Sequence, residues 1–261
     1  MTEHALSQGD IVVATLRKPE VLSDLAARYS ADRLLLLKVD VLKQEDIDEA
    51  FERTRSAFGR LDVVFVDAGY GVLMEVEGTP DDKAREVFET NFWGATNVGR
   101  AAVNEPGKRG IILQVSSVTG YHASPGFGYY TGSMVGNLDR WMGFSDGPRE
   151  RICVIEPGAF HINGHKGAVV LPQHADGSFA TSALRQTMEG AVLEGDPEKF
   201  TWIVYEVVQG GKISKGLPMG LDALEMMNLR IENLKATGWS VGLGRTDGGS
   251  DTDETRSTSS I

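Results

Sequence analysis

The amino-acid sequence predicts an α/β fold: a doubly wound parallel sheet covered by helices on both faces, which gives three layers. Two observations support this prediction. Short apolar runs alternate with segments whose apolar residues recur at helical spacing, and this alternation is typical of a parallel sheet. The apolar runs are also continuous rather than interrupted by polar residues, as strands buried on both faces are.

Five strands are expected, at residues 11–17, 33–40, 61–69, 110–117 and 151–158. Each is rich in leucine or β-branched residues. The third ends at a glycine, and the fifth ends at Pro157 and Gly158, a pair that stops a strand. Because ligands of such sheets bind beyond the carboxyl ends of the strands, candidate site residues should follow the strands directly.

Helices are expected between the strands and after the last one, at residues 19–30, 44–58, 81–103, 182–194, 196–209 and 221–236. Pro19 opens the first, and proline is favoured in the first turn of a helix. The second places Ile47, Ala50, Phe51 and Phe58 at helical spacing with charged residues between them.

The chain is expected to form a single domain over residues 1–241. Residues 161–182 are a long glycine-containing segment with few helix signals. Long irregular segments in compact domains are usually lids or disorder, and we expect a substrate lid at about residues 160–220. Residues 242–261 are polar and almost free of large apolar groups, which predicts a disordered tail.

Composition narrows the classes of partner. The formal net charge is −11, with 37 acidic and 26 basic residues, which disfavours a nucleic-acid binder. The single cysteine, Cys153, excludes an internal disulfide. His161, His165 and His174 have no carboxylate at ligand spacing, so we expect no metal site. The sequence shows no signal peptide and no apolar run long enough to span a membrane, and we expect a cytoplasmic protein without membrane contact.

Ser117 and Tyr130 form the most informative pair. Ser117 closes the fourth strand, and Tyr130 follows thirteen residues later, where a helix is expected to begin. A hydroxyl and a phenol at this spacing predict a proton-transfer site with the phenol as the acid. A catalytic phenol usually needs a nearby cation, because an unperturbed tyrosine has a pKa of about 10.

In order and spacing these motifs resemble the short-chain dehydrogenase/reductase family, in particular its classical branch of steroid and retinol dehydrogenases. The resemblance rests on "DAG" at 67–69, "ETNFWGA" around Asn91, "VSSVTG" with Ser117, Tyr130, and "IEPG" before residue 159. It runs from about residue 5 to about residue 236 and implies a Rossmann-like fold. It further implies that Ser117 polarises the substrate oxygen, that Tyr130 is the acid/base, and that Asn91 supports a lysine through water.

The resemblance also implies a nicotinamide nucleotide. The cofactor-binding residues that it implies are Arg17, Asp40, Asp67, Ala68, Gly69, Pro157 and Gly158. Arg17 and Lys18 follow a strand and favour a 2′-phosphate, hence NADP over NAD. Asp40 would accept a hydrogen bond from the adenine amino group. Pro157 and Gly158 would border the nicotinamide.

Two departures from the family pattern weaken this expectation. Met134 stands four residues after Tyr130, where the family has its lysine. The family's first strand and its glycine-rich phosphate turn have no counterpart before "EHALSQGD", which resembles the end of the first helix. Without that strand we expect two unpaired strand edges facing a gap in the sheet.

The sequence therefore predicts an NADP-dependent oxidoreductase, acting on a small hydrophobic carbonyl compound or alcohol, with weakened or lost activity. The apolar residues expected in the pocket are Phe160, Ile162, Val169, Val170 and Leu171. One alternative is a non-catalytic relative that binds a hydrophobic ligand or a protein partner. Another is that Met1 is not the natural start. A homo-oligomer is a possible assembly, and the sequence does not decide whether one forms.

Overall fold

The computed structural model confirms the α/β architecture with parallel strands. It describes residues 1–105, 110–144, 151–161, 169–172, 181–182, 185, 195–211 and 213–236. The strands are β1 Val12–Leu16, β2 Leu34–Lys38, β3 Val63–Val66, β4 Val72–Leu73, β5 Ile111–Val115, β6 Arg151–Pro157, β7 Val169–Val170 and β8 Gly216–Met219. The helices are α1 Thr2–Ser7, α2 Ser23–Ala26, α3 Gln44–Phe58, α4 Asp81–Phe88, α5 Ala95–Val103, α6 Gly128–Phe144, α9 Pro197–Gly210 and α10 Leu221–Ala236.

Every strand pair is parallel, as the continuous apolar runs predict. The main sheet has the order β3-β5-β6-β8, β1 pairs with β2, and β4 pairs with β7. The register places Val63 opposite Ile111 and Ile111 opposite Arg151, while Val12 lies opposite Leu34. Among the described residues β1 and β3 are not hydrogen-bonded to each other, so the sheet is interrupted there. The interruption lies where the sequence predicts a gap.

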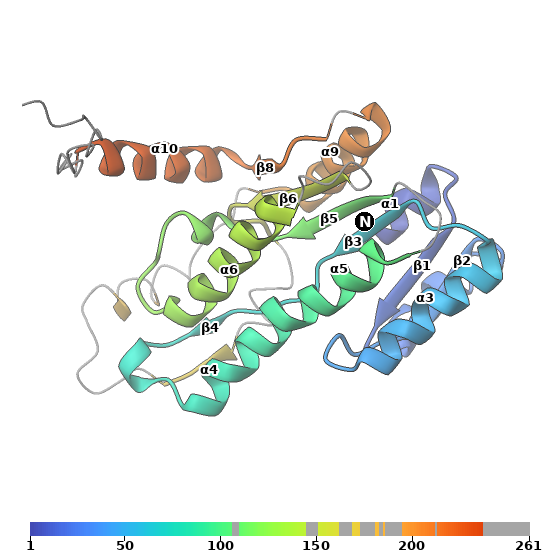
Figure 1. The fold of residues 1–261 in the computed structure, drawn as a ribbon, viewed down its shortest axis with the longest axis horizontal. Helices are drawn as coiled ribbons and strands as arrows, with labels where there is room; N and C mark the ends of the chain where they lie inside the picture. Colours follow the sequence, from blue (N-terminus) through green and yellow to red (C-terminus); the bar gives the residue numbers. More distant parts are fainter. Residues whose placement is uncertain are drawn as a thin grey trace, which may run out of the picture.

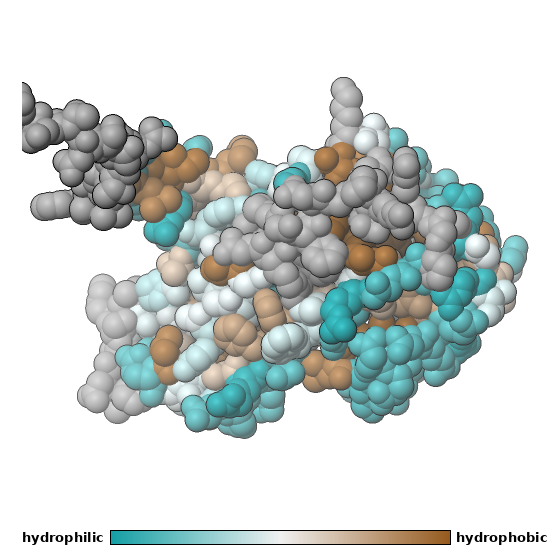
Figure 2. Space-filling view, in the orientation of Figure 1, coloured by the Kyte–Doolittle hydropathy of each residue, from teal (hydrophilic) through white to brown (hydrophobic). Residues whose placement is uncertain are grey.

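Helices cover both faces of these strands (Figure 1). On one face, α3 and α5 meet: Ile47 and Ala50 of α3 form a cluster with Leu37 and Val39, against which Val98 of α5 packs. On the other face, α9 covers the main sheet and α1 covers β1. The outward side of α3 is hydrophilic (Figure 2), as expected of an amphipathic helix.

The core lies between the central strands and these helices. Cys153, Val154 and Ile155 of β6 are fully buried, and Val204 of α9 packs on one face of them. Ala95 of α5 packs on the other face. Cys153 is therefore a buried small residue, and burial raises its pKa to about 11, which makes it unreactive at neutral pH.

Several elements differ from the expected ones. The helix expected at 19–30 is shorter: a 3₁₀ turn, η1 Pro19–Leu22, followed by α2. The helix expected at 81–103 is continuous but contains a π-helical segment, η3 Glu89–Gly94, between α4 and α5. The helix that was expected to begin near Tyr130 is α6, which starts at Gly128 and ends at Phe144. The 182–194 helix lies mostly outside the described residues, and the 242–261 tail lies wholly outside them.

Three strands were not predicted. β4 and β7 have two residues each, too few for a pattern, and β8 contains Gly216 and Pro218, which are rare in strands. α10 follows β8 and extends away from the rest of the fold, with hydrophobic residues on its surface (Figures 1 and 2). Leu221 and Leu234 of this helix are 79% and 54% exposed. No described helix has the length and apolar character needed to cross a membrane.

Candidate active site

The structure brings Ser117 and Tyr130 together, as their spacing predicts. Ser117 lies two residues after β5 and caps the turn η4 Val118–Gly120, where its Oγ accepts a hydrogen bond from the Thr119 amide at 3.2 Å. Tyr130 lies in the first turn of α6. The Ser117 hydroxyl lies close enough to the Tyr130 phenol to lower its pKa. A single substrate oxygen could therefore bind both hydroxyls.

The environment of Tyr130 keeps its phenol protonated. Burial raises its pKa above the usual value, the nearby Asp67 charge raises it further, and the Ser117 hydroxyl opposes them. None of these influences is a cation. The phenol can donate a proton at neutral pH, but it is almost never a phenolate that could accept one.

Met134 occupies the position one turn after Tyr130 on the same face of α6. Its side chain is 5% exposed, and its carbonyl accepts a hydrogen bond from Ser116 Oγ at 3.2 Å. The thioether has no charge with which to stabilise a phenolate or bind a ribose. The structure thus shows a well-packed apolar residue where a cationic helper would stand.

Asn91 is fully committed to structural contacts. It lies in η3, is 1% exposed, and pairs with the backbone of Tyr70 in both directions, at 3.0 Å to the amide and 2.9 Å to the carbonyl. Its Nδ2 also donates to Ser133 Oγ of α6 at 3.1 Å. Its own carbonyl accepts from Asn137 Nδ2 at 2.7 Å. Asn91 therefore ties the segment after β3 to the catalytic helix, and its role toward a lysine stays a prediction.

The predicted nucleotide-binding residues follow β1, β2 and β3, at the same edge as Ser117. Asp40 accepts a hydrogen bond from the Leu42 amide at 3.1 Å. Asp67, Ala68 and Gly69 are exposed to solvent. Partial desolvation by the surrounding protein nevertheless raises the Asp67 pKa to about 6, against the opposing effect of the nearby amino terminus. Arg17 is exposed and close enough to Tyr70 to affect its phenol.

Pro157 and Gly158 are not open to a ligand on every side. Asp222, at the start of α10, accepts a hydrogen bond from the Ala159 amide at 2.6 Å. A β-carbon at Gly158 would overlap the Asp222 carboxylate. The carboxylate thus covers the backbone that was expected to border a nicotinamide, and nothing in the sequence pattern indicated this contact.

The described residues fit a nicotinamide nucleotide only in part. Arg17, Asp40 and Asp67 suit the adenosine end, because they lie at the carboxyl ends of neighbouring parallel strands. Residues 1–11 form α1 and a turn, and they contain no glycine-rich turn of the kind that holds a pyrophosphate. Met134 cannot bind the ribose as an ammonium would.

Sequence analysis missed a buried acidic residue beside the site. Glu156, on β6, is 1% exposed, and its Oε1 accepts a hydrogen bond from the Tyr121 hydroxyl at 2.9 Å. Its Oε2 has no hydrogen-bond partner among the described residues. Burial raises the pKa of Glu156 to about 7, so the carboxyl is half protonated near neutrality. The sequence pattern that could have revealed this residue is a glutamate directly after the apolar run 152–155 of the strand.

Comparisons with known proteins agree with the family resemblance. A family model described as short chain dehydrogenase matches residues 1–160. Oxidoreductase BOA17 of Botryotinia fuckeliana is 30% identical over 254 residues, covering 91% of this chain and 89% of the relative. A short-chain dehydrogenase structure from Streptomyces avermitilis has a TM-score of 0.82 at 28% identity, covering 90% of this chain and 88% of that one.

A more distant structure carries a nucleotide. It is a short-chain dehydrogenase/reductase from Burkholderia phymatum in complex with NAD, with a TM-score of 0.76 at 16% identity, covering 90% of this chain and 88% of that one. At that identity the likeness concerns the fold alone, and it confirms the Rossmann-like arrangement.

Proposed function

Because the chain belongs to the short-chain dehydrogenase family, we propose that it is a weakly active, NADP-dependent oxidoreductase that reduces a small hydrophobic carbonyl compound. The observation that supports the proposal is the proximity of Ser117 and Tyr130 at the carboxyl edge of the sheet, where the Ser117 hydroxyl affects the Tyr130 pKa. Ser117 and Tyr130 hold the substrate oxygen, and Tyr130 donates the proton. A bound nicotinamide would supply the hydride.

The raised pKa of Tyr130 favours reduction over oxidation. Reduction needs a proton donor, and the neutral phenol is one at any pH near 7. Oxidation needs a phenolate, and without a cation to lower the pKa its population is roughly one part in a thousand or less. General acid–base assistance is worth about 10²–10⁴ in rate, and the absent base removes that share from alcohol oxidation.

NADP is the proposed nucleotide because Arg17 is exposed directly after β1, where a guanidinium can pair with a 2′-phosphate. A hydrophobic substrate is proposed because Val170, in the short strand β7 paired with β4, is 56% exposed. Phe160 does not support this pocket, since its ring packs against Phe200 of α9 at 5.3 Å between centroids. Ile162 lies outside the described residues.

The proposal is tested by titrating the protein with NADPH while nucleotide fluorescence is recorded, followed by NADPH oxidation with a panel of hydrophobic ketones and aldehydes. We expect binding at micromolar to submillimolar nucleotide and slow turnover that is faster with NADPH than with NADH. Absence of binding at millimolar nucleotide would overturn the proposal.

A second candidate is a non-catalytic protein that binds a hydrophobic ligand or a protein partner at the same cleft. Two observations favour it: Met134 is packed into the interior, and Asp222 covers Gly158. This candidate predicts that a hydrophobic ketone binds equally well with and without NADPH and is not consumed. Calorimetric titration of the ketone in both conditions separates the two candidates.

A further inference from the structure

Arg185 connects two short strands that are far apart in the sequence. Its Nη1 donates to the carbonyl of Leu171, the residue after β7, at 2.8 Å. Its Nη2 lies 3.4 Å from the carbonyl of Leu73, the last residue of β4, and 3.8 Å from Oε2 of Glu75. One guanidinium therefore joins the ends of β4 and β7, and we call these three contacts the Arg185 clasp.

The clasp is shielded from water. The side chains of Arg185 and Glu75 are 15% and 4% exposed, and charges at such burial are stable only when they are paired and hydrogen-bonded. Glu75 is itself held in place, because its carbonyl accepts hydrogen bonds from Thr79 Oγ1 at 2.8 Å and from the Thr79 amide at 3.0 Å. Arg185 thus ties the end of β7 to a fixed carboxylate.

Among the described residues, β7 is attached to the fold through β4. It has two residues and pairs with β4 in parallel. At the ends of the pair, the Val169 amide donates to Gly71 at 2.8 Å and the Leu171 amide donates to Leu73 at 3.2 Å. A two-stranded pair is marginally stable by itself, so a side chain that binds both strands should contribute substantially to its closure.

β4 lies beside the segment that leads into α6, the helix that carries Tyr130. The Met74 amide, directly after β4, donates to the Gly126 carbonyl at 2.8 Å. A β-carbon at Gly126 would come within 2.8 Å of Leu73 Cδ1, so the two segments are in close contact. The ring of the next residue, Phe127, packs edge-on against Tyr130 with centroids 5.9 Å apart. The β4–β7 pair is therefore a neighbour of the proposed proton donor.

β7 presents an apolar side chain at this place. Val170 is 56% exposed, whereas Val72 and Leu73 of β4 are 3% and 1% exposed. Val170 is the side chain on which we expect a hydrophobic substrate to pack. Its position depends on how β7 lies on β4, and therefore on the Arg185 clasp.

We propose that Arg185 is a positioning residue that sets substrate specificity: by closing β7 on β4 it places Val170, and so determines how well a long apolar group of the substrate packs there. Arg185 acts through β7 and not on the reacting atoms. The proposal rests on the proposed function for its class of substrate, a hydrophobic carbonyl compound.

Amide hydrogen exchange on the full chain tests the clasp without nucleotide or substrate. In Arg185→Met we expect exchange at Val169 and Leu171 to accelerate by about tenfold or more, because β7 opens more often when its side-chain tie is lost. Arg185→Lys keeps a charge for Glu75 and a donor for a carbonyl, and it should restore most of the protection. Arg185→Met combined with Glu75→Gln removes both buried charges and should accelerate exchange as the single variant does.

Calorimetric titration with 2-butanone and 2-octanone, in the presence of NADPH, tests the role in specificity. The wild-type protein should bind 2-octanone more tightly. Arg185→Met should weaken 2-octanone binding by about tenfold and 2-butanone binding by less than about twofold, since only the longer ketone reaches Val170. In turnover the KM for 2-octanone should rise by the same factor with kcat nearly unchanged, because Tyr130 stays in place.

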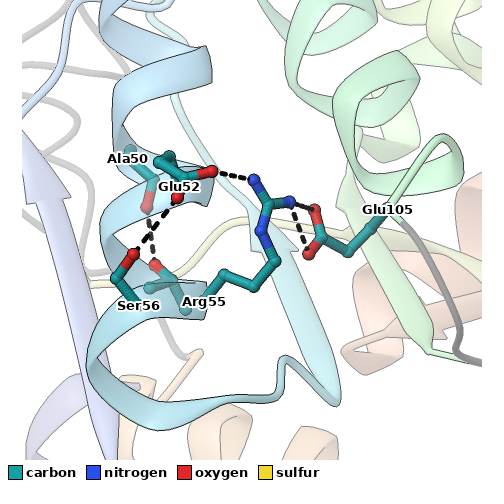
Figure 3. A network of polar contacts seen from close by, with 6 residues as sticks. Ala50, Glu52, Arg55, Ser56 and Glu105 are labelled. Atoms are coloured by element: carbon teal, nitrogen blue, oxygen red, sulfur yellow. Dashed lines mark hydrogen bonds and ion pairs between the residues drawn. The ribbon is translucent and has the colours of Figure 1, made fainter.

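Arg55→Met is the matched control. Arg55 of α3 donates to both carboxylate oxygens of Glu105, beyond the end of α5, at 3.0 and 3.1 Å, and it also pairs with Glu52 (Figure 3). Like Arg185 it connects two elements, but its side chain is 39% exposed and contacts neither β4 nor β7 in the pairs described. Its loss should change neither the exchange at β7 nor the affinity for either ketone.

The possible outcomes separate the clasp from the proposed function. Unchanged exchange at Val169 and Leu171 in both methionine variants would overturn the clasp. Faster exchange with an equal loss of affinity for both ketones would overturn the role in specificity. Ketone binding that depends on Arg185 without any NADPH oxidation would support the clasp and reject the proposed function. NADPH oxidation that is insensitive to Arg185 would do the reverse.

Discussion

The two halves of the proposed site differ in how completely they are built. The proposed substrate side consists of Ser117, Tyr130 and Asn91, and each of them takes part in a backbone or side-chain hydrogen bond, with Thr119, Ser133 and Tyr70 respectively. The proposed nucleotide side consists of Arg17, Asp40 and the segment 67–69, on strands at either side of the place where β1 and β3 are not paired. The proposed proton-transfer pair thus lies where the sheet is continuous, and the proposed nucleotide contacts lie where it is interrupted.

Two different defects can each lower the activity, and they lie on different sides of the proposed site. One is chemical: Met134 leaves Tyr130 without a cation. The other is architectural: among the described residues β1 and β3 are not hydrogen-bonded to each other, and residues 1–11 contain no glycine-rich phosphate turn. Substitutions on the proposed substrate side should change the proton chemistry, whereas substitutions in the strands beside the interruption should change nucleotide binding and stability.

The largest effect is expected from Tyr130→Phe. Removing the hydroxyl removes the only proton donor that we assign to the reaction, so NADPH-dependent reduction should fall by about 10²–10³. The free energy of unfolding should change by less than about 1 kcal/mol. Tyr129→Phe is the matched control and should leave the rate within about twofold. Equal losses in both variants would show that Tyr130 has no special role.

Met134→Lys should come next. An ammonium one turn from Tyr130 would lower the phenol pKa and strengthen it as an acid, and we expect reduction to rise by about 10- to 100-fold. Met134→Leu fills a similar volume without charge and should leave the rate nearly unchanged. If the lysine variant folds and binds NADPH but gains no rate, the cation is not what the substrate side lacks.

Glu156 should make stability depend on pH. Burial raises its folded pKa from 4.5 to about 7, so the folded state binds the proton more tightly than the unfolded state. The free energy of unfolding should therefore fall by up to about 3 kcal/mol as pH rises from about 4.5 to 7. Glu156→Gln can keep the hydrogen bond from Tyr121 and should flatten this slope. A wild-type curve from denaturant unfolding that rises over the same interval would contradict the assignment.

The smallest effect is expected from Arg55→Met, which removes the ion pair between α3 and Glu105. Glu105 is 14% exposed in its side chain, but Arg55 is open to solvent, and ion pairs with an exposed partner contribute little to stability. The thermal midpoint should therefore drop by a few degrees at most. Arg53→Met, on an exposed pair within α3, is the control and should have no measurable effect. A loss of cooperativity in the variant would show that this pair holds the two parts of the sheet together.

The main strands and the substrate side could be predicted because they depend on local pattern. Continuous apolar runs specify strands buried on both faces, and the carboxyl edge of a parallel sheet brings Ser117 near Tyr130. The helices 44–58 and 196–209 were likewise readable from spacing, with the second found at 197–210.

The remaining features depend on contacts between residues distant in the sequence. Asp222 covering Gly158, the Tyr121–Glu156 hydrogen bond and the Asn91 clamp on Tyr70 join separate elements, and no local pattern specifies them. β4 and β7 exist only because they pair with each other. The π-helical turn at Asn91 also has no composition signal, although such turns often occur at functional sites.

The central claim is that Tyr130 is a proton donor without a cationic neighbour, and the ionisation of its phenol tests this most directly. The titration can be followed by NMR with ¹³Cζ-labelled tyrosine, with Tyr130→Phe used to assign the signal. We predict a pKa above the ordinary value of about 10, because burial and Asp67 raise it. A pKa clearly below 10 would reveal a cation that stabilises the phenolate and would contradict the account.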